Sequence, residues 1–110
     1  MSESARRRAL NQAVSRDTNE AVEEMATAWE PPADPLDVRC ECSRAGCDAI
    51  LRLTLAEYEE VRSESRHFVV LHEHVDPELD RVIGTIRAYA LVEKVGDVGV
   101  EVAEATDPRS

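Results

Sequence analysis

The segment Cys40-Glu41-Cys42-Ser43-Arg44-Ala45-Gly46-Cys47 holds all three cysteines of the chain within eight residues. Two histidines, His72 and His74, follow some 25 residues later. Three thiolates and one imidazole form the ligand set of a Cys3His structural zinc site. A chain of 110 residues with only four aromatic side chains builds a modest core, and bound zinc can add on the order of 10 kcal/mol of folding free energy. The segment therefore predicts a zinc-stabilised fold.

The Cys-x-Cys-x4-Cys spacing is compatible with one metal-binding turn. Thiols at Cys40 and Cys42 share a face of an extended strand, and a turn through Gly46 can bring Cys47 back towards them. Two other interpretations stay open, namely a metal-free cluster of buried thiols and an iron–sulfur or redox site. Zinc is favoured because free thiols packed together oxidise easily, and because they are concentrated in a turn.

The fourth ligand is expected from a histidine. His67 opens a predicted strand and is interpreted as an edge residue, whereas His72 and His74 share a face at the end of that strand. We favour His74 and keep His72 as the alternative fourth ligand, since both together would give five ligands. The carboxylates of Asp48 and Glu73 are poorer candidates.

Residues 1–30 are predicted to form an N-terminal amphipathic helix that ends before Pro31-Pro32. Its apolar residues recur every three or four positions, and they are Leu10, Val14, Ala21, Val22, Met25 and Trp29. We expect this stripe to pack on its own domain, on a protein partner or on a second copy in a homodimer. In an antiparallel pair, Arg6-Arg7-Arg8 would approach the carboxylates near Glu20 of the mate.

Residues 36–96 are predicted to form a zinc-binding α+β domain. Period-two patterns indicate a small antiparallel sheet of about four strands, at residues 36–42, 49–53, 67–71 and 86–95. Thr54 and Glu57 form the sequence pattern of a capping box, which begins one helix packed on the sheet. In the first strand, Glu41 is assigned to the solvated face. Residues 97–110 are interpreted as an acidic, flexible tail.

Composition narrows the classes of partner. The net charge of −10 argues against nucleic-acid binding, because that binding needs clustered basic residues. No run of 18 apolar residues is present, and the polar N-terminus lacks the apolar core of a secretory signal, so no membrane partner is expected. We expect a cytoplasmic protein, in which the three thiols stay reduced.

The order of the motifs also resembles a group of small uncharacterised bacterial proteins. The matching features are an asparagine-containing helix (Asn11 and Asn19-Glu20), the cysteine segment, Leu53 to Arg62, Phe-Val-Val and Val92-Glu93-Lys94. In that group a histidine precedes an Asp-Pro-Glu-like segment, and the resemblance places it at His74. The resemblance covers most of the chain and implies no activity.

Three functions follow as hypotheses. The first is a non-enzymatic zinc-binding protein that acts through protein–protein interaction, with a possible regulatory role. The alternatives are a thiol-based redox or zinc sensor and a small metalloenzyme. An enzyme is disfavoured because three sulfurs and a histidine close a zinc shell, whereas catalytic zinc keeps an open position. No glycine-rich phosphate loop is present, and no pair of carboxylates can be nominated as acid and base.

Overall fold

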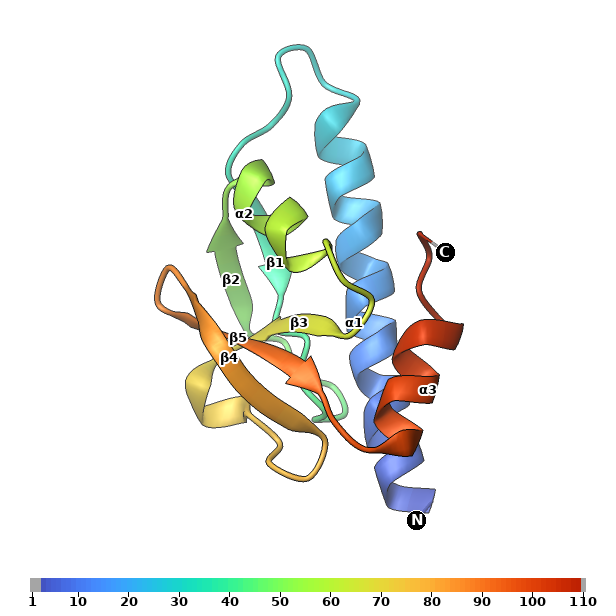
Figure 1. Cartoon of the computed structure of the whole chain (residues 1–110). Helices are drawn as coiled ribbons and strands as arrows, with labels where there is room; N and C mark the ends of the chain where they lie inside the picture. Colours follow the sequence, from blue (N-terminus) through green and yellow to red (C-terminus); the bar gives the residue numbers. More distant parts are fainter. Residues whose placement is uncertain (1–2, 110) are drawn as a thin grey trace.

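The computed structural model describes residues 3–109 and confirms the predicted α+β class (Figure 1). The helices are α1 (Glu3–Thr27), α2 (Leu55–Val61) and α3 (Asp97–Ala105), with a short 3-10 helix, η1 (His72–His74). The strands are β1 (Leu36–Arg39), β2 (Ile50–Leu53), β3 (His67–Val70), β4 (Asp80–Ile86) and β5 (Tyr89–Lys94). The capping box at the start of α2 is present, with Thr54 and Glu57 each bonded to the other's backbone.

The strands form two antiparallel sheets, which corrects the expectation of one sheet of about four strands. β1 pairs with β2 as a hairpin, and β3, β5 and β4 form a second sheet in that order. The β4–β5 hairpin was missed because β4 lacks a clean alternation of apolar and polar residues. Its side chains Val82 and Ile83 are both exposed, and the pairing slips between Val82 and Gly84. Only the strand over residues 86–95 was predicted there.

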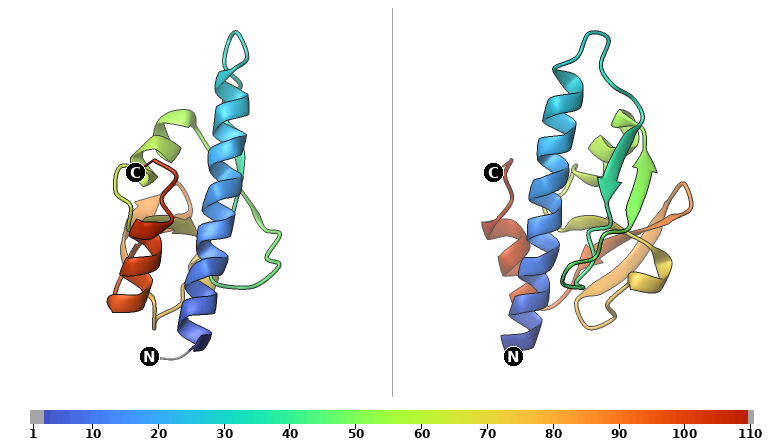
Figure 2. Two further views of the ribbon diagram at one scale, coloured as in Figure 1. Left: turned by 90° about the vertical axis from the view of Figure 1, so that its right-hand side faces the viewer. Right: turned by 180° about the vertical axis from the view of Figure 1, so that it is seen from behind.

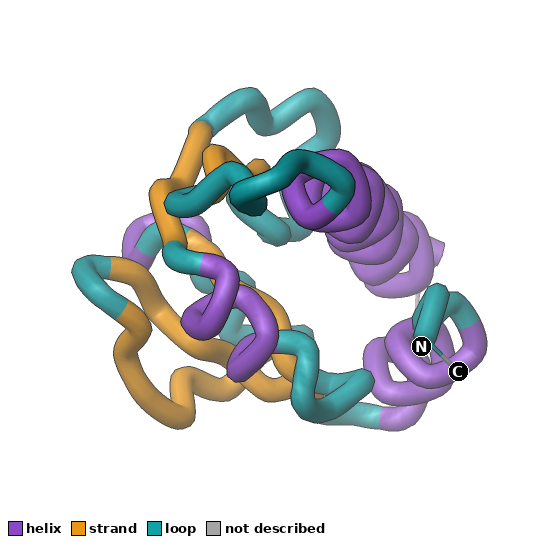
Figure 3. Tube along the Cα trace, turned by 90° about the horizontal axis from the view of Figure 1, so that it is seen from above, coloured by secondary structure: helices purple, strands orange, loops and turns teal. Residues whose placement is uncertain are grey.

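α1 lies beside the sheets (Figures 2 and 3). It packs with the face opposite to the predicted apolar stripe, so of the three expected coverings of that stripe its own domain is excluded. Four residues of the predicted apolar stripe are exposed, with exposed fractions of 43% for Leu10, 61% for Val14, 70% for Met25 and 69% for Trp29. The buried residues of α1, here called the inner face, are Ala5, Ala9, Gln12, Ala13, Ser15, Arg16, Asn19 and Ala26. Small and polar side chains therefore cover the core, and the large apolar ones face outwards.

The predicted flexible tail is wrong over residues 97–105, which form α3 (Figure 1). α3 packs beside the N-terminal half of α1 and buries Val102 and Ala103. Beyond the helix, Asp107 is buried and forms an ion pair with Arg62. The acidic residues of this segment, Asp97, Glu101 and Glu104, lie among its apolar positions, and their charge was given more weight than Val98, Val102 and Ala103. The C-terminal segment thus completes the core beside α1.

Candidate metal site

The three cysteines lie on the loop that joins β1 to β2. Cys40 follows the last residue of β1, and its backbone N–H donates to the carbonyl of Ala49 at 3.0 Å, which continues the hairpin pairing. Cys42 comes two residues later at the start of the turn. Gly46 then adopts a φ of +69°, a conformation that side chains other than glycine rarely take, and it returns the chain to Cys47. The glycine-assisted turn expected from the sequence is therefore present.

His74 reaches the cysteines from the loop after β3. The turn of η1 is closed by the His74 N–H, which donates to the Leu71 carbonyl at 2.9 Å. His74 points towards the thiols, whereas His72 is exposed and lies outside the cluster. His67 contacts Glu93 on β5 instead, at 3.4 Å. The structure thus brings the favoured histidine, His74, next to the three cysteines, whereas His67 and His72 lie outside the cluster.

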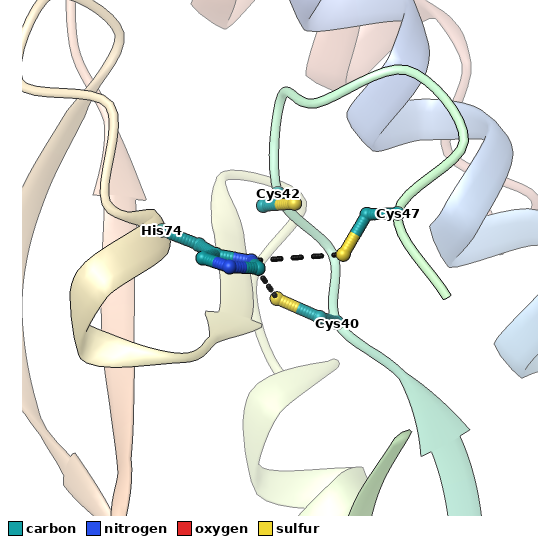
Figure 4. Close-up of side chains that lie close together, drawn as sticks. All are labelled: Cys40, Cys42, Cys47 and His74. Atoms are coloured by element: carbon teal, nitrogen blue, oxygen red, sulfur yellow. Dashed lines mark hydrogen bonds between the residues drawn. The ribbon is translucent and has the colours of Figure 1, made fainter. Parts of the chain in front are cut away.

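The four side chains form one compact cluster (Figure 4). The Sγ atoms of Cys40, Cys42 and Cys47 and the ring nitrogen of His74 all lie within 4.8 Å of one another. The His74 Nδ1 atom is 3.6 Å from Sγ of Cys40 and 3.6 Å from Sγ of Cys47. Zinc bonds of about 2.3 Å to sulfur and about 2.1 Å to nitrogen, set at tetrahedral angles, separate S and N by about 3.6 Å. The cluster is close enough to hold a metal ion.

The electrostatics of the thiols favour deprotonation of one of them. The neighbouring Cys40 thiol lowers the pKa of Cys42 to about 5, with further help from the Arg44 backbone and despite burial. The same contact raises the pKa of Cys40, and burial raises it further. The Leu71 N–H donates to Cys40 Sγ at 3.3 Å, which stabilises negative charge on that sulfur. The cluster thus presents a thiolate to a cation even before a metal displaces the remaining protons.

Side-chain contacts tie the cysteine loop to the histidine loop. Ser43 Oγ donates to Asp76 Oδ2 at 2.9 Å, and Arg44 donates to the Glu73 carbonyl at 3.2 Å. Arg8 from α1 also donates to Asp76, at 2.5 Å. These contacts flank the four candidate ligands on both loops. They hold the two loops together independently of the thiols themselves.

α1 holds the cysteine loop through its side-chain amides. Asn19 Nδ2 donates to the Arg39 carbonyl at 2.9 Å, and Asn19 Oδ1 accepts from the Arg39 N–H at 2.7 Å. Gln12 Nε2 donates to the Glu41 carbonyl at 3.3 Å, and Asn11 Nδ2 donates to the Ser43 carbonyl at 3.0 Å. The loop lacks strand partners on this side, so the amides satisfy backbone groups that would otherwise be buried unpaired. The helix therefore fixes the backbone that carries the cysteines.

Glu41, between the first two cysteines, is fully buried, which corrects its assignment to the solvated face. Its carboxylate accepts hydrogen bonds from Asn19 Nδ2 at 2.9 Å, from the Tyr58 hydroxyl at 3.0 Å and from the Val69 N–H at 3.2 Å. Burial raises the pKa of Glu41, and these three donors oppose that shift. The Glu41 N–H in turn donates to the Val69 carbonyl at 2.9 Å. Glu41 thus joins α1, α2 and β3 beside the cysteines.

One sequence signal could have located these supporting residues. The inner face recurs every three or four positions, like the apolar stripe, but it is made of alanine, amide and arginine side chains. A search for apolar periodicity passes over it. The signal is the regular spacing of Gln12, Arg16 and Asn19 among small residues, because polar groups on a buried face need polar partners. No comparable signal marks Glu41. It alternates with Cys40 and Cys42, as a residue on the exposed face of a strand would.

Comparisons of the chain with models of protein families, with curated proteins and with solved structures found no match. The resemblance to small bacterial proteins therefore stays a prediction. Among residues 3–109, each helix is too short or too polar to cross a lipid bilayer. The fold and the cluster thus define an α+β protein with a group of four side chains that could hold a metal ion.

Proposed function

We propose that the protein is a non-enzymatic zinc-binding protein whose zinc is structural. Zinc would be held by Cys40, Cys42, Cys47 and His74, and it would join the β1–β2 loop to the loop after β3. The observation that supports this most strongly is the 3.6 Å separation of His74 Nδ1 from two sulfurs, which matches the S–N edge of a zinc tetrahedron of about 3.6 Å. Sulfur-rich donor sets of this kind favour zinc over magnesium or calcium.

A structural role is supported by the closed donor set. Four protein donors fill a tetrahedral shell, so no position is left for an activated water, which catalytic zinc requires. Cys40 and Cys42 are 0% and 1% exposed, so the metal would be covered from the core side. Because zinc binds only the folded loops, its binding free energy would stabilise the fold. The thiols must stay reduced to bind, which is consistent with a cytoplasmic protein.

An action through protein contact is supported by the outward face of α1. Leu10, Val14 and Met25 are large apolar side chains on a helix whose other face already covers the core. Exposed apolar residues gathered on one face are typical of surfaces that bind other proteins. The structural zinc would then hold the loops to which α1 is attached, and α1 would present this face.

Metal analysis of the full chain, purified without added metal, tests the zinc proposal. We expect about one zinc per chain, and a large loss of zinc in Cys42→Ser and His74→Ala. His72→Ala is the matched control, because His72 lies in the same turn but is exposed and outside the cluster. Less than about 0.2 equivalents of any transition metal in a folded sample would refute the proposal. Greater zinc loss in His72→Ala than in His74→Ala would refute the ligand assignment.

One observation favours the sensor as a second candidate function. Cys47 is partly exposed, unlike Cys40 and Cys42, so an oxidant in solution can reach one sulfur of the site. Oxidation of Cys47 and a neighbouring thiolate to a disulfide by peroxide, which is reduced to water, would release zinc. Zinc release within minutes at stoichiometric peroxide, reversed by a thiol reductant, would support the sensor. Release only over hours would support the structural role alone.

A further inference from the structure

The outward face of α1 has the spacing of a helix–helix seam. Its exposed residues recur in steps of three and four, and six of them, here called the outer seam, are Arg7, Leu10, Val14, Asp17, Ala21 and Glu24. This 3–4 spacing is the repeat that keeps one side of a helix in continuous contact with another helix. In the left view of Figure 2, α1 runs its full length with no other segment of the chain crossing in front of it.

We propose that the outer seam binds the outer seam of a second copy of this chain, with the two α1 helices antiparallel. The proposal rests on the proposed function, in which the protein acts by protein contact, and it names the partner. A two-fold interface requires a surface that is complementary to itself. The outer seam meets that requirement in one register, where the numbers of facing residues sum to 31.

In this register, opposite charges meet at both ends of the seam. Arg7 of one copy faces Glu24 of the other, and the symmetry repeats the pair at the far end. Both side chains are exposed, and within residues 3–109 neither forms an ion pair in the single chain. A parallel pair would instead place Arg7 against Arg7 and Glu24 against Glu24, and like charges repel. The charges therefore select the antiparallel orientation.

The sizes of the apolar side chains agree with the same register. Leu10 faces Ala21 of the other copy, so a large residue meets a small one on both sides of the two-fold axis. Met25 flanks the seam and is 70% exposed in the single chain, so it can cover the edge of the contact. The seam from residue 7 to residue 24 is about 26 Å long at 1.5 Å per residue. A contact of this length is small, and it indicates a weak, reversible dimer.

Asp17 opposes this contact, so a change at Asp17 tests the proposed register directly. It faces Val14 of the other copy close to the two-fold axis, so the two Asp17 carboxylates come near each other in the dimer. In the single chain Asp17 is exposed and forms no ion pair among the described residues. Removing its charge should therefore strengthen the dimer without unfolding the chain. A polar residue at one central seam position can set the register at the expense of stability.

Sedimentation equilibrium of the full-length, metal-loaded chain tests the proposal at concentrations from about 10 μM to about 1 mM. We expect a monomer–dimer equilibrium that Arg7→Glu weakens at least about fivefold. The double exchange Arg7→Glu with Glu24→Arg should restore the wild-type affinity, and Asp17→Asn should increase it about tenfold. Circular dichroism of each variant, expected to be unchanged, checks that the chain stays folded.

Two outcomes separate this inference from the proposed function. A zinc-loaded chain that remains monomeric at about 1 mM, with Asp17→Asn also monomeric, would overturn the dimer and leave the zinc proposal standing. A dimer that responds as expected but carries no metal would overturn the zinc proposal and leave the dimer standing. A dimer that Arg7→Glu and the double exchange weaken equally would show that another surface forms the contact, and it would overturn the inference.

Discussion

The two faces of α1 invert the usual relation between burial and polarity. The inner face covers the core with alanine, amide and arginine side chains, while the outer seam carries Leu10 and Val14 into solvent. The inner face is polar because the segment beneath it, residues 39–43, offers unpaired backbone groups rather than apolar side chains. A helix can therefore bury polar side chains where the neighbouring segment supplies their hydrogen-bond partners. Apolar spacing alone does not identify the buried face.

Arg16 shows how a charged side chain is accommodated on the inner face. Its side chain is fully buried, where it donates to the carbonyls of Ser65 and Ala103 at 2.8 Å each and lies 4.7 Å from the centre of the Phe68 ring. Burial lowers the pKa of Arg16. The carbonyls and the ring replace the water that a guanidinium loses, so Arg16 links α1 to α3 and β3.

The largest expected effect comes from removing the metal, which tests whether the inner face depends on the cysteine loop. Chelation of the zinc-loaded chain should lower the free energy of unfolding by several kcal/mol, because metal binding and folding are linked. Hydrogen exchange should show lost protection in β1, in η1 and along α1. Equal thermal midpoints with and without chelator, within about 2 °C, would contradict the structural role of the site.

The next largest effect is expected at Asn19 on the inner face. Asn19→Ala leaves the Arg39 backbone and the Glu41 carboxylate short of partners in a buried place, and should lower the free energy of unfolding by about 3 kcal/mol. Asp17→Ala, on the opposite face, is the matched control and should change it by less than about 0.5 kcal/mol. Urea denaturation at low protein concentration measures both. Similar losses in the two variants would remove the distinction between the faces.

A pair of identical substitutions compares the packing of the two faces. Ala9 is 2% exposed where α1 meets α3, so Ala9→Leu should overfill that contact and lower the free energy of unfolding by about 2 kcal/mol. Ala21 is exposed, so Ala21→Leu should leave the stability of the monomer within about 0.5 kcal/mol of wild type. Thermal unfolding at micromolar concentration compares them. A larger loss for Ala21→Leu would show that the wrong face has been assigned to the core.

A further effect, no larger than the last, is expected from acid titration of Asp107, which anchors the C-terminal segment to Arg62 and Ser65. Hydrogen bonds from Ser65 and the Arg109 N–H, together with Arg62, outweigh burial and lower the pKa of Asp107 to about 2. Because the folded-state pKa lies below the ordinary value of 3.8, this stabilisation is present above about pH 4 and is lost as the pH falls through about 2.

The loss should amount to up to about 2 kcal/mol between pH 4 and pH 2. Asp107→Asn should show a correspondingly flatter dependence of unfolding free energy on pH over this window, as measured by urea denaturation at each pH. An identical slope in the variant and the wild type would show that other carboxylates produce the acid dependence.

Sequence reasoning predicted the features that local chemistry determines. The fold class, the long N-terminal helix and the capping box at Thr54 followed from periodicity and from side chains that bond their own backbone. The four proposed ligands were selected from spacing and residue type, and the structure brings them together. Their occupancy by zinc remains a prediction.

The features that were missed depend on contacts between distant parts of the chain. Glu41 is buried because Asn19, Tyr58 and Val69 converge on its carboxylate, and no local pattern reports that convergence. α3 was missed because its few apolar residues pack against distant segments, namely α1, Leu79 and, through Ala103, the main core. The strands divide into two sheets because β1 pairs with β2, and beyond Arg39 the chain meets β3 through Glu41, whose N–H donates to the Val69 carbonyl, before it turns into the cysteine loop.

The position of α1 in the chain has a consequence for synthesis. α1 leaves the ribosome before the segments that its inner face binds, which are residues 39–43, Asp80 and the carbonyl of Ala103. An isolated helix is only marginally stable in water until tertiary contacts cover one of its faces. At translation rates of about 5–20 residues per second, it must wait several seconds for its last contact. Because α1 is made before its partners, it is completed only when they arrive, and until then the nascent chain displays the outer seam without the core beneath α1.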